Sequence, residues 1–148
     1  MAAKIISINV SPKKGMRKKA VDSAVLKENF GIEDDAHASG KWHRQVSLLA
    51  AESIKKIQDK GLDVGPGDFA ENFTTEGIEL FTLPIGTKMI AGDGIELEVS
   101  QIGKLCHSRC AIYEQAGDCV MPREGIFVKV LKGGTIKTGD KIEVVGAG

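Results

Sequence analysis

The residues best suited to chemistry in this chain of 148 are its three cysteines, which all lie between positions 106 and 119 among basic side chains. The group comprises Lys104, Cys106, His107, Arg109, Cys110, Cys119 and Arg123. A thiolate, and not a thiol, acts as nucleophile or metal ligand, and nearby cations lower the pKa of a thiol because they stabilise its charged form. The basic residues around Cys106 and Cys110 are placed to do this for either thiol.

Three interpretations of this cluster stay open. Cysteine can serve simply as a small buried apolar residue. Cys106 and Cys110 also have a Cys-x3-Cys spacing, which with Cys119 and a histidine would complete a structural zinc site. The third interpretation is a thiolate at a functional pocket, which the flanking cations favour. Spacing alone does not rank the three.

A second group of candidate residues lies in the stretch 34–44, which has no apolar periodicity and is expected to be a loop. It holds Asp35, His37, His43 and Arg44 beside Trp42, the only tryptophan. Histidine near neutral pH can carry a proton, ligate a metal or hydrogen-bond within a core. Two histidines with Asp and Arg in one glycine-containing loop make both a functional and a structural role plausible.

Glu71 and Asn72 interrupt an otherwise apolar, strand-like stretch at 69–75. A buried Glu-Asn pair can satisfy the backbone of a turn or contact a ligand, and both roles stay open. Arg123 precedes a predicted strand, where a guanidinium suits bidentate recognition of phosphate or carboxylate.

Short β-branched runs bounded by glycine and proline predict the elements that position these residues. Strands are expected at 4–10, 24–28, 69–75, 78–83, 88–91, 95–102, 125–131 and 141–145, and 13–19 is expected to be a basic loop. The stretch 45–60 begins extended and becomes the one clear helix, with Leu49, Ile54 and Ile57 on one face and Gly61 after its end.

Glycine supports the same fold class. The chain has 18 glycines, and two similar segments, IGTKMIAGDGIELEV and GGTIKTGDKIEVV, place Gly-Asp before an alternating strand. Glycine there would take the positive φ of a tight turn. Six to eight short strands with one or two helices predict a mainly β fold, a closed or nearly closed β-barrel that leaves few exposed edges.

Composition excludes several classes of function. The 20 Lys and Arg cancel the 20 Asp and Glu, so no overall field attracts nucleic acid or an acidic membrane. No run approaches the roughly 18 apolar residues of a membrane helix, and the N-terminus does not resemble a signal peptide. GxxxxGK[ST], GxGxxG and GxSxG are absent. We expect one domain over residues 1–148, cytoplasmic and in a reducing setting, because the cysteine count is odd.

Taken in order, several segments resemble the MOSC domain, named for the C-terminal domain of molybdenum cofactor sulfurase. The matching stretches are 35–37, 43–49, 67–72, 77–78, 85–86, 97–107, 109–110, 119–127 and 134–140. Each is weak singly, but their ordered coincidence over most of the chain is specific. The chain resembles the short, stand-alone bacterial form of the family.

The resemblance implies a barrel-like fold and a cysteine that carries sulfur or ligates molybdenum. Counting on from Leu97 without a gap places that cysteine at Cys106, whereas matching the Arg-Cys pair places it at Cys110. All three cysteines are candidate metal ligands. The candidate contacts to a bound molybdenum cofactor (molybdopterin) are His37, His43, Arg44, Glu71, Asn72, Lys104, His107, Arg109 and Arg123.

The function implied is to bind molybdenum cofactor, to carry sulfur on a cysteine for delivery to a metal–sulfur centre, or both. Its partners would be the cofactor or a sulfur donor or acceptor protein. The alternatives are a non-enzymatic delivery module and a component of a molybdenum-dependent reductase acting on N-hydroxylated compounds. Zinc is the alternative metal.

Overall fold

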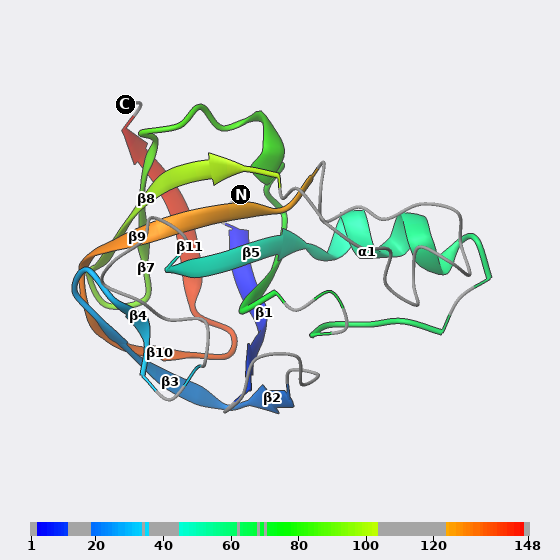
Figure 1. Cartoon of the computed structure of the whole chain (residues 1–148), viewed down its shortest axis with the longest axis horizontal. Helices are drawn as coiled ribbons and strands as arrows, with labels where there is room; N and C mark the ends of the chain where they lie inside the picture. The colour runs from blue at the N-terminus through cyan, green and yellow to red at the C-terminus, as the bar shows by residue number, and fades with distance from the viewer. Residues whose placement is uncertain are drawn as a thin grey trace.

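The computed structural model of the chain describes residues 3–11, 19–33, 35, 45–61, 63–67, 69, 71–103 and 124–146, and shows a closed β-barrel (Figure 1). The barrel strands, in spatial order, are β11 (Lys141–Gly146), β7 (Lys88–Ala91), β8 (Ile95–Ile102), β9 (Ile126–Lys132), β5 (Val46–Ala50), β6 (Phe73–Glu76) and β1 (Ala3–Val10). Pairing of β1 with β11 closes the ring, with Ala3 opposite Ile142. The prediction of a mainly β, closed barrel is confirmed.

Smaller elements surround this ring. A second sheet contains β10 (Gly134–Lys137), β3 (Ser23–Lys27) and β4 (Gly31–Ile32), while β2 (Lys19–Val21) pairs with the end of β1. Two helical elements have bounds within the described residues, α1 (Ala51–Gln58) and a 3-10 turn, η1 (Leu80–Thr82). In the described ranges no helix is both long and apolar enough to cross a membrane.

One strand pair departs from the antiparallel rule of this barrel. β5 and β6 run parallel, with Leu48 opposite Phe73, whereas the other pairs of the ring are antiparallel. Parallel neighbours need a crossover connection to return the chain to the starting end, and α1 lies in that connection. Figure 1 shows α1 projecting from the side of the barrel where β5 ends.

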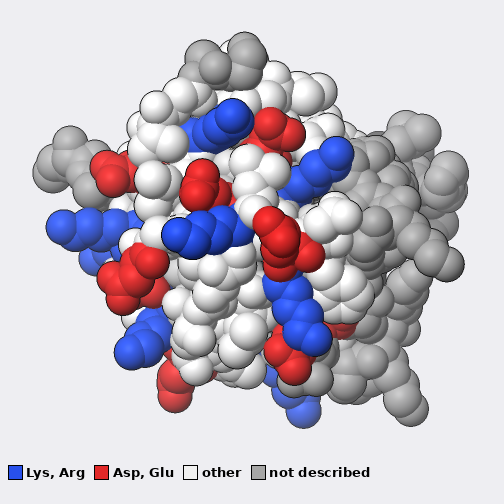
Figure 2. All heavy atoms as spheres, turned by 90° about the vertical axis from the view of Figure 1, so that its left-hand side faces the viewer, with Lys and Arg blue, Asp and Glu red and all other residues white. Residues whose placement is uncertain are grey.

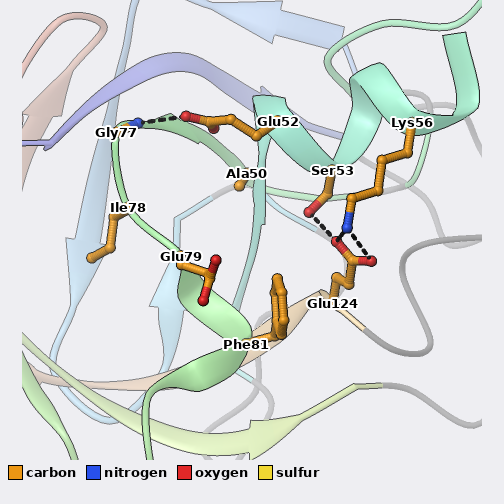
Figure 3. Close-up of a pocket in the computed structure, with 9 residues that line it drawn as sticks. All are labelled: Ala50, Glu52, Ser53, Lys56, Gly77, Ile78, Glu79, Phe81 and Glu124. Atoms are coloured by element: carbon orange, nitrogen blue, oxygen red, sulfur yellow. Dashed lines mark hydrogen bonds and ion pairs between the residues drawn. The ribbon is translucent and has the colours of Figure 1, made fainter. Parts of the chain in front are cut away.

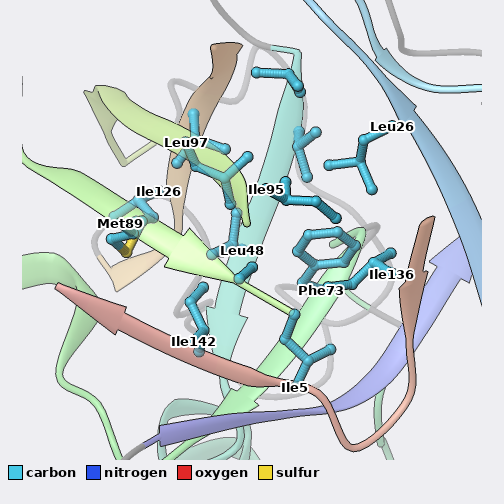
Figure 4. Packing of buried hydrophobic residues seen from close by; sticks show 14 of the residues in the cluster. Ile5, Leu26, Leu48, Phe73, Met89, Ile95, Leu97, Ile126, Ile136 and Ile142 are labelled. Atoms are coloured by element: carbon cyan, nitrogen blue, oxygen red, sulfur yellow. The ribbon is translucent and has the colours of Figure 1, made fainter. Parts of the chain in front are cut away.

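Among the described residues, the core cluster in the barrel interior consists of aliphatic side chains, Met89 and one aromatic ring, Phe73 (Figure 4). Ile5, Leu48, Phe73 and Leu97 are each fully buried and come from four different strands. Burying one such side chain contributes about 1.5–3 kcal/mol, so closing the ring is what stabilises the short strands. A second group of buried residues lies outside this core cluster and includes Leu49, Phe127 and the α1 residues Ile54 and Ile57.

Most of the predicted elements are present. The stretch 45–60 does begin extended, as β5, and continue as α1, and Gly61 has the positive φ (92°) expected after its end. Strands 88–91 and 95–102 have the predicted bounds. Both Gly-Asp turns place glycine at positive φ, 56° at Gly92 and 95° at Gly139.

The predicted strand 78–83 is wrong, because this segment forms η1 instead. Its hydrogen bonds close locally: Leu83 N–H donates to the carbonyl of Leu80, and the Thr82 hydroxyl to that of Glu79. Pro84 follows directly and cannot donate a backbone hydrogen bond to a neighbouring strand. The strand predicted at 69–75 begins only at Phe73, and β2, β4 and β10 were not predicted.

Charges of both signs are interspersed on the described part of the face in Figure 2. Cross-strand neighbours on the barrel wall alternate in sign, as with Lys88 opposite Glu98 and Glu98 opposite Lys129. Opposite charges on facing strands stabilise a sheet modestly. Positive and negative side chains therefore alternate on this wall, in keeping with the equal numbers of the two in the whole chain.

We predict that Gly133→Ala weakens the contact between the second sheet and the barrel. A Cβ at Gly133 would overlap the backbone carbonyl of Leu26 in β3 and lie 3.2 Å from the amide nitrogen of Glu28. Both are backbone atoms, which cannot move aside as the end of a flexible side chain could. The free energy of unfolding in a urea titration should fall by about 2–3 kcal/mol. Gly146→Ala, which meets nothing within 4 Å, should change it by less than about 0.5 kcal/mol. Equal effects of the two changes would contradict this account.

Candidate functional site

Three of the predicted candidate residues, Asp35, Glu71 and Asn72, lie within the described residues. The others lie outside them: His37, His43, Arg44, Lys104, Cys106, His107, Arg109, Cys110, Cys119 and Arg123. Within the described ranges no three His, Cys, Asp or Glu side chains converge as a metal site. The roles predicted for the cysteines and histidines therefore stay predictions.

Asn72 joins the strands on both sides of β6. On the β5 side, its Oδ1 accepts hydrogen bonds from the backbone N–H of Ser47 (3.0 Å) and from the Ser47 hydroxyl (3.2 Å). On the β1 side, its Nδ2 donates to the carbonyl of Asn9 at 3.1 Å, and its own carbonyl accepts from the Asn9 N–H at 2.6 Å. Asn72 is only 2% exposed. It thus pairs the backbones of β5 and β1 just before β6 begins.

The Glu71 side chain accepts hydrogen bonds that stabilise the turn before β6. Its Oε1 accepts the backbone N–H of Gly67 at 3.0 Å, and its Oε2 accepts the Thr74 hydroxyl at 2.8 Å. The side chain is fully buried, and this loss of hydration raises the pKa of Glu71 above its ordinary value of 4.5, although these hydrogen bonds oppose the shift. The carboxylate is therefore a buried acceptor for turn backbone.

These contacts support the structural interpretation of the Glu-Asn pair that the sequence left open. The polar atoms of Glu71 and Asn72 bond to protein groups from β1, β5 and β6 and from the turn before β6. The network continues to the end of β1, where the N–H of Ser11 donates to Oδ1 of the buried Asp35 at 3.1 Å. A cofactor contact by either residue of the pair stays a prediction.

The segment that carries all three cysteines, residues 104–123, leaves and rejoins the barrel at one place. The N–H of Gly103 donates to the carbonyl of Gly125 at 2.6 Å. Just inside this bond, β8 and β9 pair with Ile102 opposite Ile126. Strand pairing thus fixes the base of the cysteine-bearing segment.

A pocket of about 390 Å³ lies beside that base, between α1 and η1 (Figure 3). Ala50, Ile78 and Phe81 supply its apolar wall, and Glu52, Glu79, Glu124, Ser53, Lys56 and Gly77 complete the lining. In Figure 3, Glu79 and Phe81 point from η1 toward α1. The Lys56 Nζ lies 5.5 Å from the centroid of the Phe81 ring.

Glu124 connects this pocket to the cysteine-bearing segment. Its carboxylate accepts the Ser53 hydroxyl at 2.7 Å and pairs with Lys56 Nζ at 2.8 and 2.9 Å. Sequence reasoning placed Arg123 near a binding site but gave no role to Glu124. The sequence held one sign of a partner for the helix: Ser53 and Lys56 are three residues apart, so both donors lie on one face of a helix and can share one acceptor.

The charges of the pocket decide which ligands it suits. The lining carries three carboxylates, those of Glu52, Glu79 and Glu124, and one ammonium, that of Lys56, which pairs with Glu124. Like charges repel, so this lining does not fit the phosphate of a pterin cofactor. The cationic side chains that would fit a phosphate, at Lys104, Arg109 and Arg123, belong to the neighbouring segment.

Replacing Asn72 by aspartate should test its joining role. In Asn72→Asp, a carboxylate oxygen would face the Asn9 carbonyl where Nδ2 now donates, so the free energy of unfolding should fall by about 3 kcal/mol. Asn29→Asp is the matched control, because Asn29 is exposed and its Oδ1 accepts from Gln45, as a carboxylate also would. A stable Asn72→Asp protein would refute the joining role.

Stability should also depend on pH through Glu71. Because its pKa is raised in the folded state, the folded protein holds this proton more tightly than the unfolded chain does. Its contribution is greatest below the unfolded pKa and is lost as pH rises through the folded pKa. The unfolding free energy of the unsubstituted protein, minus that of Glu71→Gln, should therefore fall as pH rises from the unfolded pKa of about 4.5 through the raised pKa of the folded protein.

The control for this titration is Glu76→Gln, at an exposed carboxylate on β6. Unfolding is followed in urea at each pH for all three proteins. A pH-independent difference between the unsubstituted protein and Glu71→Gln would contradict the raised pKa.

Known protein structures share this architecture. The chain is similar to the YUAD protein from Bacillus subtilis, with TM-score 0.82 and 20% identity, covering 97% of this chain and 96% of that one. It is similar to YiiM from Geobacillus stearothermophilus, with TM-score 0.71 and 21% identity, covering 97% and 75%. For YiiM from Escherichia coli the values are 0.71 and 16%, covering 100% and 71%. At these identities the likeness shows the fold alone.

Sequence comparison identifies the family. No curated protein matches the chain significantly. A family model described as the MOSC domain matches residues 35–143, which is well over half of the chain and includes both histidines of the stretch 34–44 and all three cysteines. The chain therefore belongs to the MOSC domain family, which is related to the molybdenum cofactor.

Proposed function

We propose that the function of this protein in molybdenum cofactor chemistry depends on a cysteine thiolate of the segment 104–123. This thiolate acts either as a sulfur carrier or as a ligand of the cofactor's molybdenum. The observation that carries the proposal is the Gly103–Gly125 hydrogen bond at the base of that segment. It anchors a stretch with three thiols and several cations at one point of a rigid barrel. Functional groups are commonly presented on loops held by such a scaffold.

The donor set of this segment fits the cofactor chemically. Thiolates are soft ligands that suit a metal such as molybdenum, and guanidinium groups suit phosphate and planar hydrogen-bonding edges. Arg44, Arg109 and Arg123 would hold the phosphate and the pterin edge, and Cys106 or Cys110 would reach the metal. When bound, the cofactor would supply redox chemistry at molybdenum, while the chain binds and orients it.

The sulfur-carrier version needs no external oxidant. A thiolate of Cys106 or Cys110 attacks the outer sulfur of a donor persulfide, a new S–S bond forms, and the donor leaves as a thiolate. The sulfane sulfur is thereby moved without net oxidation. An acceptor thiolate then attacks the outer sulfur of the Cys persulfide, and the cysteine of this chain leaves as a thiolate. A dithiol of the acceptor supplies the two electrons that reduce this sulfur to sulfide in a metal–sulfur centre and is itself oxidised to a disulfide. Flanking cations favour the attacking thiolate.

Mass spectrometry of the purified protein should detect this cargo as an adduct of about 32 Da on Cys106 or Cys110. The adduct should disappear on reduction and in the Cys→Ser variant of the carrier cysteine, and should persist in Cys119→Ser. Loss of the adduct in Cys119→Ser alone would refute the assignment.

Metal and pterin analysis of protein made in a molybdate-replete host separates the two versions. Bound pterin with molybdenum supports the ligand version, and the adduct without pterin supports the carrier. Stoichiometric zinc whose removal unfolds the protein would instead establish a structural metal site and refute both.

A further inference from the structure

We propose that the pocket between α1 and η1 binds a small organic cation, which is a protonated amine or a guanidinium carried on an apolar body. The pocket has a volume of about 390 Å³, within the range of small-molecule sites. This inference goes beyond the proposed function, because the binding needs neither a thiol nor the cofactor. Three properties of the described lining define the class of ligand: its apolar wall, its unbalanced charge and its aromatic ring.

The apolar wall of the pocket is continuous with the core of the barrel. Ala50 belongs to the core cluster and is 4% exposed, Ile78 packs against that cluster, and the Phe81 side chain is half-buried. A ligand that covers this wall removes apolar area from water, which stabilises the complex. A small hydrated metal ion would leave the wall uncovered. The wall therefore favours a cation with hydrocarbon next to its charge.

The charged part of the lining has two negative charges in excess. Glu52, Glu79 and Glu124 each carry one, and Lys56 neutralises one of the three by pairing with Glu124 at 2.8 Å. The Glu52 carboxylate accepts the backbone N–H of Gly77 at 2.9 Å, a neutral donor that leaves its charge uncompensated. Opposite charges attract more strongly beside apolar walls than in open water. The lining thus complements a ligand of positive charge.

Glu79 is the carboxylate that a ligand can use directly. Within the described ranges no N–H, hydroxyl or ammonium group donates to its carboxylate, and its backbone carbonyl accepts the Thr82 hydroxyl at 2.9 Å. Figure 3 shows its side chain directed toward α1, into the space between the two helical elements. A ligand ammonium or guanidinium there would gain a charge-assisted hydrogen bond, which is stronger than a bond between neutral groups.

The Phe81 ring adds a surface that favours a cation. Lys56 Nζ already lies 5.5 Å from the ring centroid, within the distance of a cation–π contact. Figure 3 shows the ring between Glu79 and the Lys56–Glu124 pair. A ligand cation held by Glu79 would therefore lie near the ring as well. Both groups would act on the same charge.

Lys56 is the lining residue that should oppose this ligand. Its ammonium repels a second cation and neutralises Glu124, so its removal should strengthen binding. A gain of affinity is informative, because damage to the fold would weaken binding instead. Lys55 is the matched control: it is the adjacent lysine on α1, pairs with Asp59 at 3.3 Å and is not part of the lining. Methionine at either position removes one charge and keeps good helix propensity.

The test is an NMR titration of the isotope-labelled full chain with phenethylamine at about pH 7, where an alkyl ammonium is protonated. The backbone amide signals of Gly77, Ile78 and Phe81 should shift and saturate. Phenethyl alcohol, a neutral analogue of similar shape, should bind about tenfold more weakly, because it lacks the charge that the carboxylates attract. Hydrocinnamate, an anionic analogue, should cause no saturable shift of these signals.

Four variants locate the site. Glu79→Gln should weaken the binding of phenethylamine about fivefold, and Lys56→Met should strengthen it about threefold. Lys55→Met and Glu76→Gln each remove one exposed charge outside the lining and should change the dissociation constant less than about twofold. The proposal is overturned if the alcohol binds as tightly as the amine, if Lys56→Met does not strengthen binding, or if Lys55→Met strengthens it equally.

A capped lysine, N-acetyl-lysine methylamide, distinguishes a free amine from the side chain of a partner protein. It should bind more weakly than phenethylamine, because its peptide groups cannot replace hydrocarbon on the apolar wall. Tighter binding of the capped lysine would overturn the assignment to a small molecule. Failure of these titrations leaves the tests of sulfur adduct and pterin unaffected, since those tests involve no residue of this wall.

Discussion

The barrel depends on the hydrogen bonds that Asn72 makes to β5 on one side and to β1 on the other. Strands β5 and β6 are parallel in a ring whose other pairs are antiparallel, so they cannot be joined by a tight turn. The chain must leave the barrel, and α1 lies in the resulting connection. Asn72 and Glu71 then fix the point of return. The position of α1, and with it the pocket and the contacts of Ser53 and Lys56 with Glu124, follows from this single parallel pair.

Sequence patterns were most informative where one face of a strand is buried. Alternation located β7 and β8, because burial of alternate residues leaves a readable pattern, and the second Gly-Asp turn located β11, in which Ile142 is the single buried residue. They failed for β4, which has two residues, and for β10, where Ile136 is the single buried residue. The segment 78–83 misled the prediction because its apolar residues suggest a strand, whereas the local hydrogen bonds of η1 and the following Pro84 decide its structure.

For the candidate site, the sequence identified residue types better than their roles. Glu71 and Asn72 were recognised as unusual, but only the structure shows that Ser47, Asn9, Gly67 and Thr74 use their polar atoms. These partners come from distant parts of the chain, which no local pattern reveals. Glu124 was overlooked for the same reason: Ser53 and Lys56 lie about 70 positions away. The cysteine, histidine and arginine roles rest on the sequence and on membership of the MOSC family.

The pairing of β1 with β11 also bears on how the protein is made. Ala3 contacts Ile142, so the contact that closes the ring joins residues from opposite ends of the described chain. During synthesis β1 is made before β11, so it lacks one of its two neighbours in the ring until β11 is made. Until then the barrel is an open sheet with an unpaired edge and an exposed apolar face, and such non-local closure is slow. The nascent chain is therefore most prone to aggregate in the interval when the other strands of the ring have been made but β11 has not yet closed it.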